Sequence, residues 1–113
     1  MATETQPETM TEADWNALGQ RLFGPEIKRW RFRCPTCNNV WSYEKADTFA
    51  EEQRAKLRGH WHVEQECVGR YIDGAGCDWC AYGLFCGPFF VLREGGKKTP
   101  VFGFDLEVEV ANG

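Results

Sequence analysis

The sequence predicts an α+β fold with two short helices and a C-terminal β-hairpin. Three observations carry this prediction. Apolar residues recur at helical spacing near the N-terminus. Two apolar segments near the C-terminus flank Gly95–Gly96, which is typical of a hairpin. Between these regions lie two Cys-x-x-Cys pairs, Cys34/Cys37 and Cys77/Cys80. A chain of 113 residues suits one domain.

The first helix is expected at Glu12–Phe23. Thr11 can cap it, with Asp14 three residues later as in a capping box. Trp15, Leu18 and Leu22 form one apolar stripe, and Gly24–Pro25 ends the helix. Residues 1–10 are polar and are expected to form a disordered arm, so the single domain would comprise residues 11–113.

A strand is expected at Lys28–Arg33, directly before the first cysteine pair. Trp30 and Phe32 would occupy one face and Arg29, Arg31 and Arg33 the other. A returning strand is expected at Val40–Tyr43.

The second helix is expected at Asp47–Arg58. It is strongly charged, with Phe49 and Leu57 as apolar anchors, and should mostly face water. The hairpin strands are expected at Phe89–Arg93 and Pro100–Val110. In the second of these, alternation predicts an acidic outer face that includes Asp105, Glu107 and Glu109.

The cysteine spacing indicates a zinc ribbon. Cys34 and Cys37 form one Cys-x-x-Cys pair, and Cys77 and Cys80 form another. Each tight turn can aim two thiolates at one point, so two turns complete the tetrahedron that Zn²⁺ prefers. A rival set replaces Cys80 with Cys67, and the residues alone leave this choice open. A second metal bound by Cys86, His60 or His62 is a further alternative.

Four sequence motifs resemble a small family of uncharacterised phage and prophage proteins. They are Cys34-Pro-Thr-Cys37-Asn, Glu66-Cys67-Val68-Gly69-Arg70, Gly76-Cys77-Asp78-Trp79 and Tyr82-Gly83-Leu84-Phe85. The family pattern is C-P-x-C-G, then C-[IV]-G-R, then G-x-C-[DNT]-[WY]-A-x-x-G-L-F. The resemblance covers about residues 30–93.

The resemblance implies that the four metal ligands are Cys34, Cys37, Cys67 and Cys77. The chain departs from the family pattern at Cys80, where Ala is usual, and at Cys86. It also has Asn38 where Gly is usual, and Cys80 stays a possible substitute ligand. The resemblance implies a phage origin and no particular reaction.

Charge and composition narrow the possible functions. The net charge of −4 arises from residues 1–26, which hold five acids and one base, and it argues against generic DNA binding. The sequence shows no secretory signal and no apolar membrane span, so cytoplasmic localisation is expected. There, cysteines are more often thiols or metal ligands than disulfides.

We do not expect an enzyme. His62-Val63-Glu64 with Cys77 and Cys80 imitates a zinc-deaminase signature. The match lacks the proline that precedes the cysteine pair, and the separation between Glu64 and Cys77 is too short. It also leaves Cys34 and Cys37 unused. Four thiolates would fill the zinc shell, as in a structural site.

The sequence leaves two candidate functions. The first is a phage accessory protein that binds a host or phage protein, with inhibition of a host defence as one form. The alternative is a nucleic-acid-binding zinc ribbon, in which residues 28–33 interleave bases with aromatics.

Overall fold

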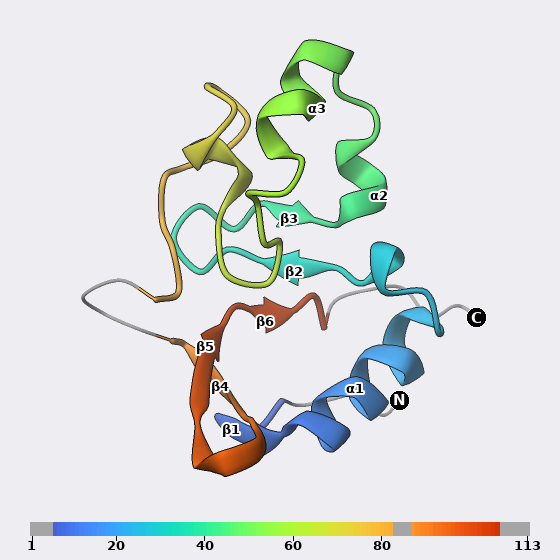
Figure 1. Cartoon of the computed structure of the whole chain (residues 1–113), viewed down its shortest axis with the longest axis vertical. Coiled ribbons are helices and arrows are strands. Elements are labelled where there is room, and N and C mark those ends of the chain that lie inside the picture. The colour runs from blue at the N-terminus through green and yellow to red at the C-terminus, as the bar shows by residue number, and fades with distance from the viewer. Residues whose placement is uncertain (1–5, 83–86, 107–113) are drawn as a thin grey trace.

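Two small sheets and three α-helices make up the part of the chain that the computed structural model describes, residues 6–82 and 87–106 (Figure 1). This confirms the α+β class. The helices are α1 (Glu12–Phe23), α2 (Tyr43–Ala46) and α3 (Glu51–Leu57). Short 3₁₀ turns are η1 (Ile27–Arg29), η2 (Val68–Arg70) and η3 (Glu94–Gly96). The strands are β1 (Thr9–Thr11), β2 (Phe32–Arg33), β3 (Val40–Trp41), β4 (Phe89–Leu92), β5 (Lys98–Val101) and β6 (Gly103–Phe104).

Helix α1 forms as predicted. The backbone N–H of Asp14 donates to Thr11 Oγ1 at 3.1 Å, which caps the first turn. Trp15 and Leu18 are buried, and Gly24 ends the helix at φ 92°. In the described residues, no helix combines the length and the apolar character that a membrane span requires.

The first sheet has the order β3-β2-β6 and is antiparallel throughout. The expected strand Lys28–Arg33 is shorter than predicted, because residues 27–29 form the turn η1. Trp30 and Phe32 are nevertheless buried, while Arg31 is exposed, as the alternation predicted. The expected strand Val40–Tyr43 ends at Trp41, because Ser42 Oγ accepts the Lys45 N–H and caps α2.

An aromatic cluster joins α1 to this sheet. Trp15 stacks on Phe104 with ring centroids 5.5 Å apart, and Phe104 stacks on Phe32 at 5.0 Å. Trp30 is fully buried and lies edge-on to Trp15 at 5.6 Å. Gly19 permits this approach, because a Cβ there would lie 2.6 Å from the Trp30 ring. These rings form the part of the core that carries β2 and the chain leading into Cys34.

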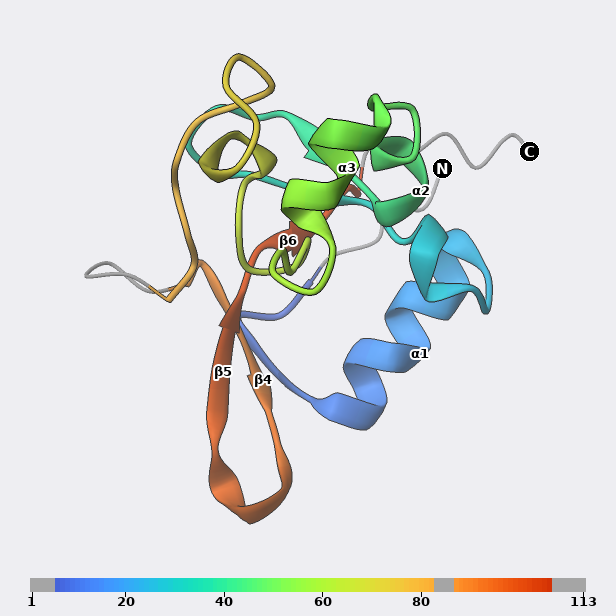
Figure 2. The same ribbon diagram turned by 45° about the horizontal axis from the view of Figure 1, so that its top comes forward.

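The second sheet has the order β1-β4-β5 and contains the predicted hairpin, β4–β5, which extends away from the rest of the fold in Figure 2. Strand β1 pairs in parallel with β4, with Thr9 opposite Phe90. Gln6 Oε1 also accepts the Phe104 N–H at 2.8 Å. The expectation of a disordered arm is therefore wrong at residues 6 and 9–10. Backbone pairing with a strand edge needs no apolar side chains, so the polar composition does not reveal it.

The expected strand Pro100–Val110 is divided between the two sheets. Strand β5 ends at Val101 and β6 begins at Gly103, while the Phe102 N–H donates to Glu64 O at 2.7 Å. The predicted acidic outer face is wrong at Asp105, which is 5 % exposed and accepts from Arg33 Nη2 at 2.8 Å. Glu107 and Glu109 lie outside the described residues.

The second predicted helix begins later than expected. Helix α3 starts at Glu51, because residues 47–49 continue the turn that follows α2 through backbone bonds to residues 44–46. Leu57 is buried and Phe49 stacks on Trp41 at 5.2 Å, so both act as the expected apolar anchors. Helices α2 and α3 lie at the end of the molecule opposite the β4–β5 hairpin (Figure 1).

Candidate metal centre

Four cysteine sulfurs converge at one point. The Sγ atoms of Cys34, Cys37, Cys67 and Cys77 all lie within 4.8 Å of one another. Cys34 Sγ lies 3.5 Å from Cys77 Sγ, and Cys37 Sγ lies 3.7 Å from Cys67 Sγ. A disulfide would need about 2.05 Å. A tetrahedron with metal–sulfur distances of about 2.3 Å has edges of about 3.8 Å. The arrangement is therefore compatible with a metal site.

The first two sulfurs come from the turn between β2 and β3. The Cys34 N–H donates to Asn39 O at 3.0 Å, and the Asn38 N–H donates to Cys34 O at 2.9 Å. Asn38 has φ 64°, the left-handed conformation that Asn tolerates better than most residues. This tight turn places Cys34 and Cys37 on the same side of the loop.

The other two sulfurs are brought together by pairing of two irregular segments. The Cys67 N–H donates to Trp79 O at 3.0 Å, and the Ala81 N–H donates to Gln65 O at 2.7 Å. Glu66 and Cys80 form an antiparallel bridge between these bonds. The chain between the two cysteines therefore closes into a loop that begins with η2 and returns at Cys77.

Two glycines permit this close packing around the sulfurs. A Cβ on Gly69 would lie 2.3 Å from Cys77 O, and a Cβ on Gly76 would lie 2.7 Å from Cys67 Sγ. Real Cβ atoms do not approach backbone or sulfur so closely, so both positions require glycine. The cysteine spacing does not reveal the role of these two glycines. The available signal was their place beside the cysteines, in Cys67-Val68-Gly69 and Gly76-Cys77.

Burial of the cluster disfavours several thiolates unless a cation lies between them. Burial raises the pKa of the Cys34 thiol and of the Cys67 thiol. Burial also acts to raise the pKa of Cys37, but the backbone N–H groups of Asn39 and Cys77 lower it to about 7. Further thiolates this close would repel one another without a positive charge between them. A divalent cation supplies that charge and displaces the protons.

The other candidate ligands that the structure describes do not belong to the four-cysteine group. Within the described ranges, the four-cysteine group is the one that gathers three or more possible ligand atoms, and it excludes Cys80. His60 and His62 are exposed and do not belong to this group. The deaminase-like pairing of His62 with Cys77 and Cys80 is therefore not assembled. Cys86 lies outside the described residues.

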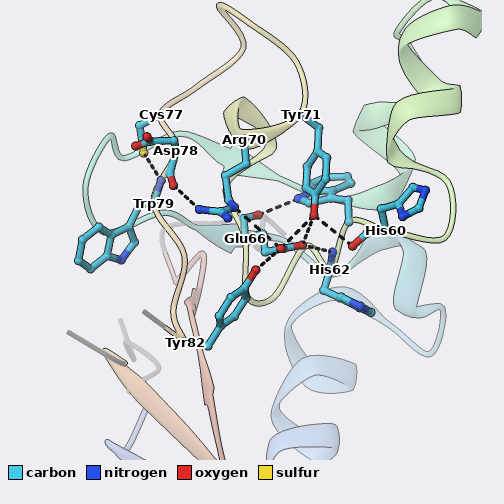
Figure 3. A network of polar contacts seen from close by, with 10 residues as sticks. His60, His62, Glu66, Arg70, Tyr71, Cys77, Asp78, Trp79 and Tyr82 are labelled. Atoms are coloured by element: carbon cyan, nitrogen blue, oxygen red, sulfur yellow. Dashed lines mark hydrogen bonds and ion pairs between the residues drawn. The ribbon is translucent and has the colours of Figure 1, made fainter. Parts of the chain in front are cut away.

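A buried carboxylate lies next to the cluster in the chain. Glu66 is 4 % exposed, and Figure 3 shows Tyr71, Tyr82 and Arg70 pointing toward it. Tyr71 Oη donates to its carboxylate at 3.0 Å, Tyr82 Oη donates to Oε2, and the His62 N–H donates to Oε1 at 3.0 Å. Burial acts to raise the pKa of Glu66, but these donors lower it below its usual range. The network ties Tyr82 to the segment that carries Cys67.

Tyr82 is expected to report on this network during an alkaline titration. Its hydrogen bond to the Glu66 carboxylate raises its pKa to about 12. The bond exists only while the phenol is protonated, so its stabilising effect is complete below the ordinary tyrosine pKa of about 10. That effect is lost as the pH rises through about 12.

In Glu66→Gln, the Tyr82 pKa should move back toward about 10. Tyrosinate absorbance, with Tyr82→Phe to assign the transition, measures the change. An unchanged Tyr82 transition in Glu66→Gln would mean that the two side chains do not interact in solution.

Comparison with known proteins identifies a family for the chain. A model of the VVA0879-like family matches residues 11–105, which includes the four cysteines and both glycines beside them. Neither the curated proteins nor the solved structures give a match. Since the matched region spans most of the 113 residues, the chain belongs to the VVA0879-like family.

Proposed function

We propose that the chain is a small zinc-stabilised binding module that acts in the cytoplasm by engaging another protein. The observation that carries the proposal is the convergence of the Cys34, Cys37, Cys67 and Cys77 sulfurs within 4.8 Å of one another. Four sulfur ligands suit Zn²⁺ among the common divalent ions. They also complete its preferred shell, which leaves no position for water or substrate.

A filled shell supports a structural ion and a non-enzymatic role. Catalytic zinc sites keep three protein ligands and one open position. The cluster instead joins the β2–β3 turn to the loop that runs from η2 to Cys77. The proposed likeness to a zinc ribbon is supported by the same arrangement, in which Cys34 and Cys37 come from one segment and Cys67 and Cys77 from another.

The partner in this proposal is a host or phage protein. The sequence motifs that resemble phage and prophage proteins support a phage origin, and the small size suits an accessory protein. Inhibition of a host defence is one form that such binding would take.

The ion pairs of the arginines argue against the alternative function, nucleic-acid binding. Arg29 Nε lies 3.4 Å from Glu44 Oε2 and 3.7 Å from Glu26 Oε1, and Arg33 pairs with Asp105. Their charges are therefore partly neutralised within the protein, which weakens the attraction to phosphate that nonspecific binding requires.

Affinity capture from nuclease-treated bacterial lysate tests the proposal. The zinc-loaded protein should enrich a specific protein, and a Cys34→Ser protein should not. In parallel, single-stranded and duplex oligonucleotides are titrated at two salt concentrations. Salt-sensitive oligonucleotide binding that disappears after charge reversal at Arg29 and Arg31, without enrichment of a protein, would overturn the proposal in favour of nucleic-acid binding.

A further inference from the structure

A hollow of about 430 Å³ lies beside helices α2 and α3. Its walls include Tyr43 and Ala46 from α2, Leu57 from α3, and Trp61 just beyond α3. This volume falls in the range of sites that enclose a side chain or a small ligand. It belongs to a part of the fold that the four-cysteine cluster does not use.

The apolar wall is held in place by internal contacts. Tyr43 and Trp61 pack edge to face with ring centroids 5.5 Å apart. Trp61 Nε1 donates to Glu66 O at 2.7 Å, and Leu57 and Trp61 are 7 % and 5 % exposed. A wall that is already ordered loses little conformational entropy when it binds an apolar group.

The rim of the hollow is basic, although the whole chain carries a net charge of −4. Arg54, Arg58 and His62 line it, with Asp47 as the acidic residue among the lining groups. Glu51 Oε1 accepts from Arg54 Nη2 and Glu51 Oε2 accepts from Arg58 Nη2, each at 2.9 Å. Arg54 Nε has no hydrogen-bond partner among the described residues.

These contacts leave donors for a second carboxylate. A guanidinium offers five N–H donors, and Glu51 occupies only part of those on Arg54 and Arg58. Glu51 and Arg58 are both more than half exposed, and such pairs contribute little stability. An incoming carboxylate can therefore share or replace Glu51 at little cost.

We propose that this hollow binds an acidic peptide segment of the partner protein. One apolar side chain of the peptide fills the space against Trp61 and Leu57, and a neighbouring carboxylate binds Arg54 and Arg58. Apolar anchoring with arginine recognition of acidic groups is a known combination in peptide binding. The proposal rests on the binding function above and names its surface and the chemistry of its partner.

Fluorescence anisotropy with synthetic peptides tests this inference. The probe is a labelled, end-blocked peptide with one Phe flanked by two Glu on each side. One comparison peptide replaces the Glu residues with Gln, and a second replaces the Phe with Ser. Free phenylacetate is added as an unlabelled competitor. The acidic Phe peptide should bind, and both substituted peptides should bind more weakly.

Substitutions at Glu51 and Arg58, the first residue of α3 and the residue after its end, are expected to change the peptide affinity in opposite directions. Arg58→Gln should weaken binding roughly three- to fivefold, the size of an exposed charge pair. Glu51→Gln should strengthen binding by a similar factor, because it frees both arginines. Lys56→Gln is the matched control, since it removes one positive charge two residues before Arg58 but does not line the hollow.

The outcomes separate this inference from the proposed function. Equal binding of the Glu and Gln peptides, or no effect of Arg58→Gln and Glu51→Gln, would overturn the hollow as an acidic-peptide site. So would displacement of the labelled peptide by an equal concentration of phenylacetate, which would indicate a small-molecule site. If lysate capture still enriches a protein and Arg58→Gln does not reduce it, the binding function stands and its surface lies elsewhere.

Discussion

Removal of the proposed zinc ion is expected to abolish the cooperative thermal unfolding transition of the protein. Structural zinc contributes on the order of 10–16 kcal/mol in small zinc-finger peptides near neutral pH. That is comparable to the whole stability of a typical domain, about 5–15 kcal/mol. The β2–β3 turn and the η2 loop meet at the four sulfurs, so both should loosen without the ion. Thermal unfolding followed by near-UV circular dichroism, with and without a strong chelator, measures the effect.

Single cysteine substitutions provide the matched comparison. Cys34→Ser should lose the metal and the sharp transition, because Cys34 is buried in the cluster. Cys80→Ser should keep both, because Cys80 is partly exposed and lies outside the four-sulfur group. Metal lost in Cys80→Ser but retained in Cys67→Ser would instead support the ligand set that spacing alone suggested, which contains Cys80 in place of Cys67.

The substitution Gly69→Ala is expected to have the second largest effect. The added Cβ would lie 2.3 Å from Cys77 O and 2.3 Å from the carbonyl carbon of Gly76. Both neighbours are backbone atoms, so relief requires the loop to move and to carry Cys77 with it. Overpacking costs about 1–3 kcal/mol and sometimes more. We expect a loss at the upper end of this range, together with weaker metal binding in a chelator competition assay.

Gly74→Ala is the control for this prediction, because Gly74 lies in the same loop. Gly74 has φ 83°, so Ala there incurs the left-handed strain of about 1–2 kcal/mol, but a Cβ would contact nothing within 4 Å. Metal affinity should therefore fall in Gly69→Ala and stay near that of the unmodified protein in Gly74→Ala. Equal affinities in the two variants would show that the tight packing at Gly69 does not position the sulfurs.

Much of the fold could be predicted from local patterns. The cap at Thr11, the apolar stripe of α1 and the Gly95–Gly96 hairpin depend on residues close together in the chain, and the structure contains all three. The alternation of Trp30 and Phe32 likewise predicted which side chains are buried. Such features need no knowledge of distant contacts.

Strand β1, the burial of Asp105 and the choice of the fourth cysteine share one physical cause, which is pairing between distant segments. Strand β1 pairs with the edge of β4, and in residues 6–11, which are mostly polar, Met10 is the one side chain that packs against the core, too little to predict a strand. Asp105 looked like one position of an acidic outer face, but it is buried against Arg33. The choice of Cys67 over Cys80 depends on the pairing of residues 65–67 with 79–81, and spacing in the chain cannot show this.

X-ray absorption at the zinc edge, on protein purified without added metal, tests the central claim most directly. We expect one zinc per chain with four sulfur neighbours at about 2.3 Å, and loss of that signal in Cys34→Ser. A zinc-free protein that unfolds cooperatively in chelator, or a zinc ion with nitrogen, oxygen or water in its shell, would contradict the account.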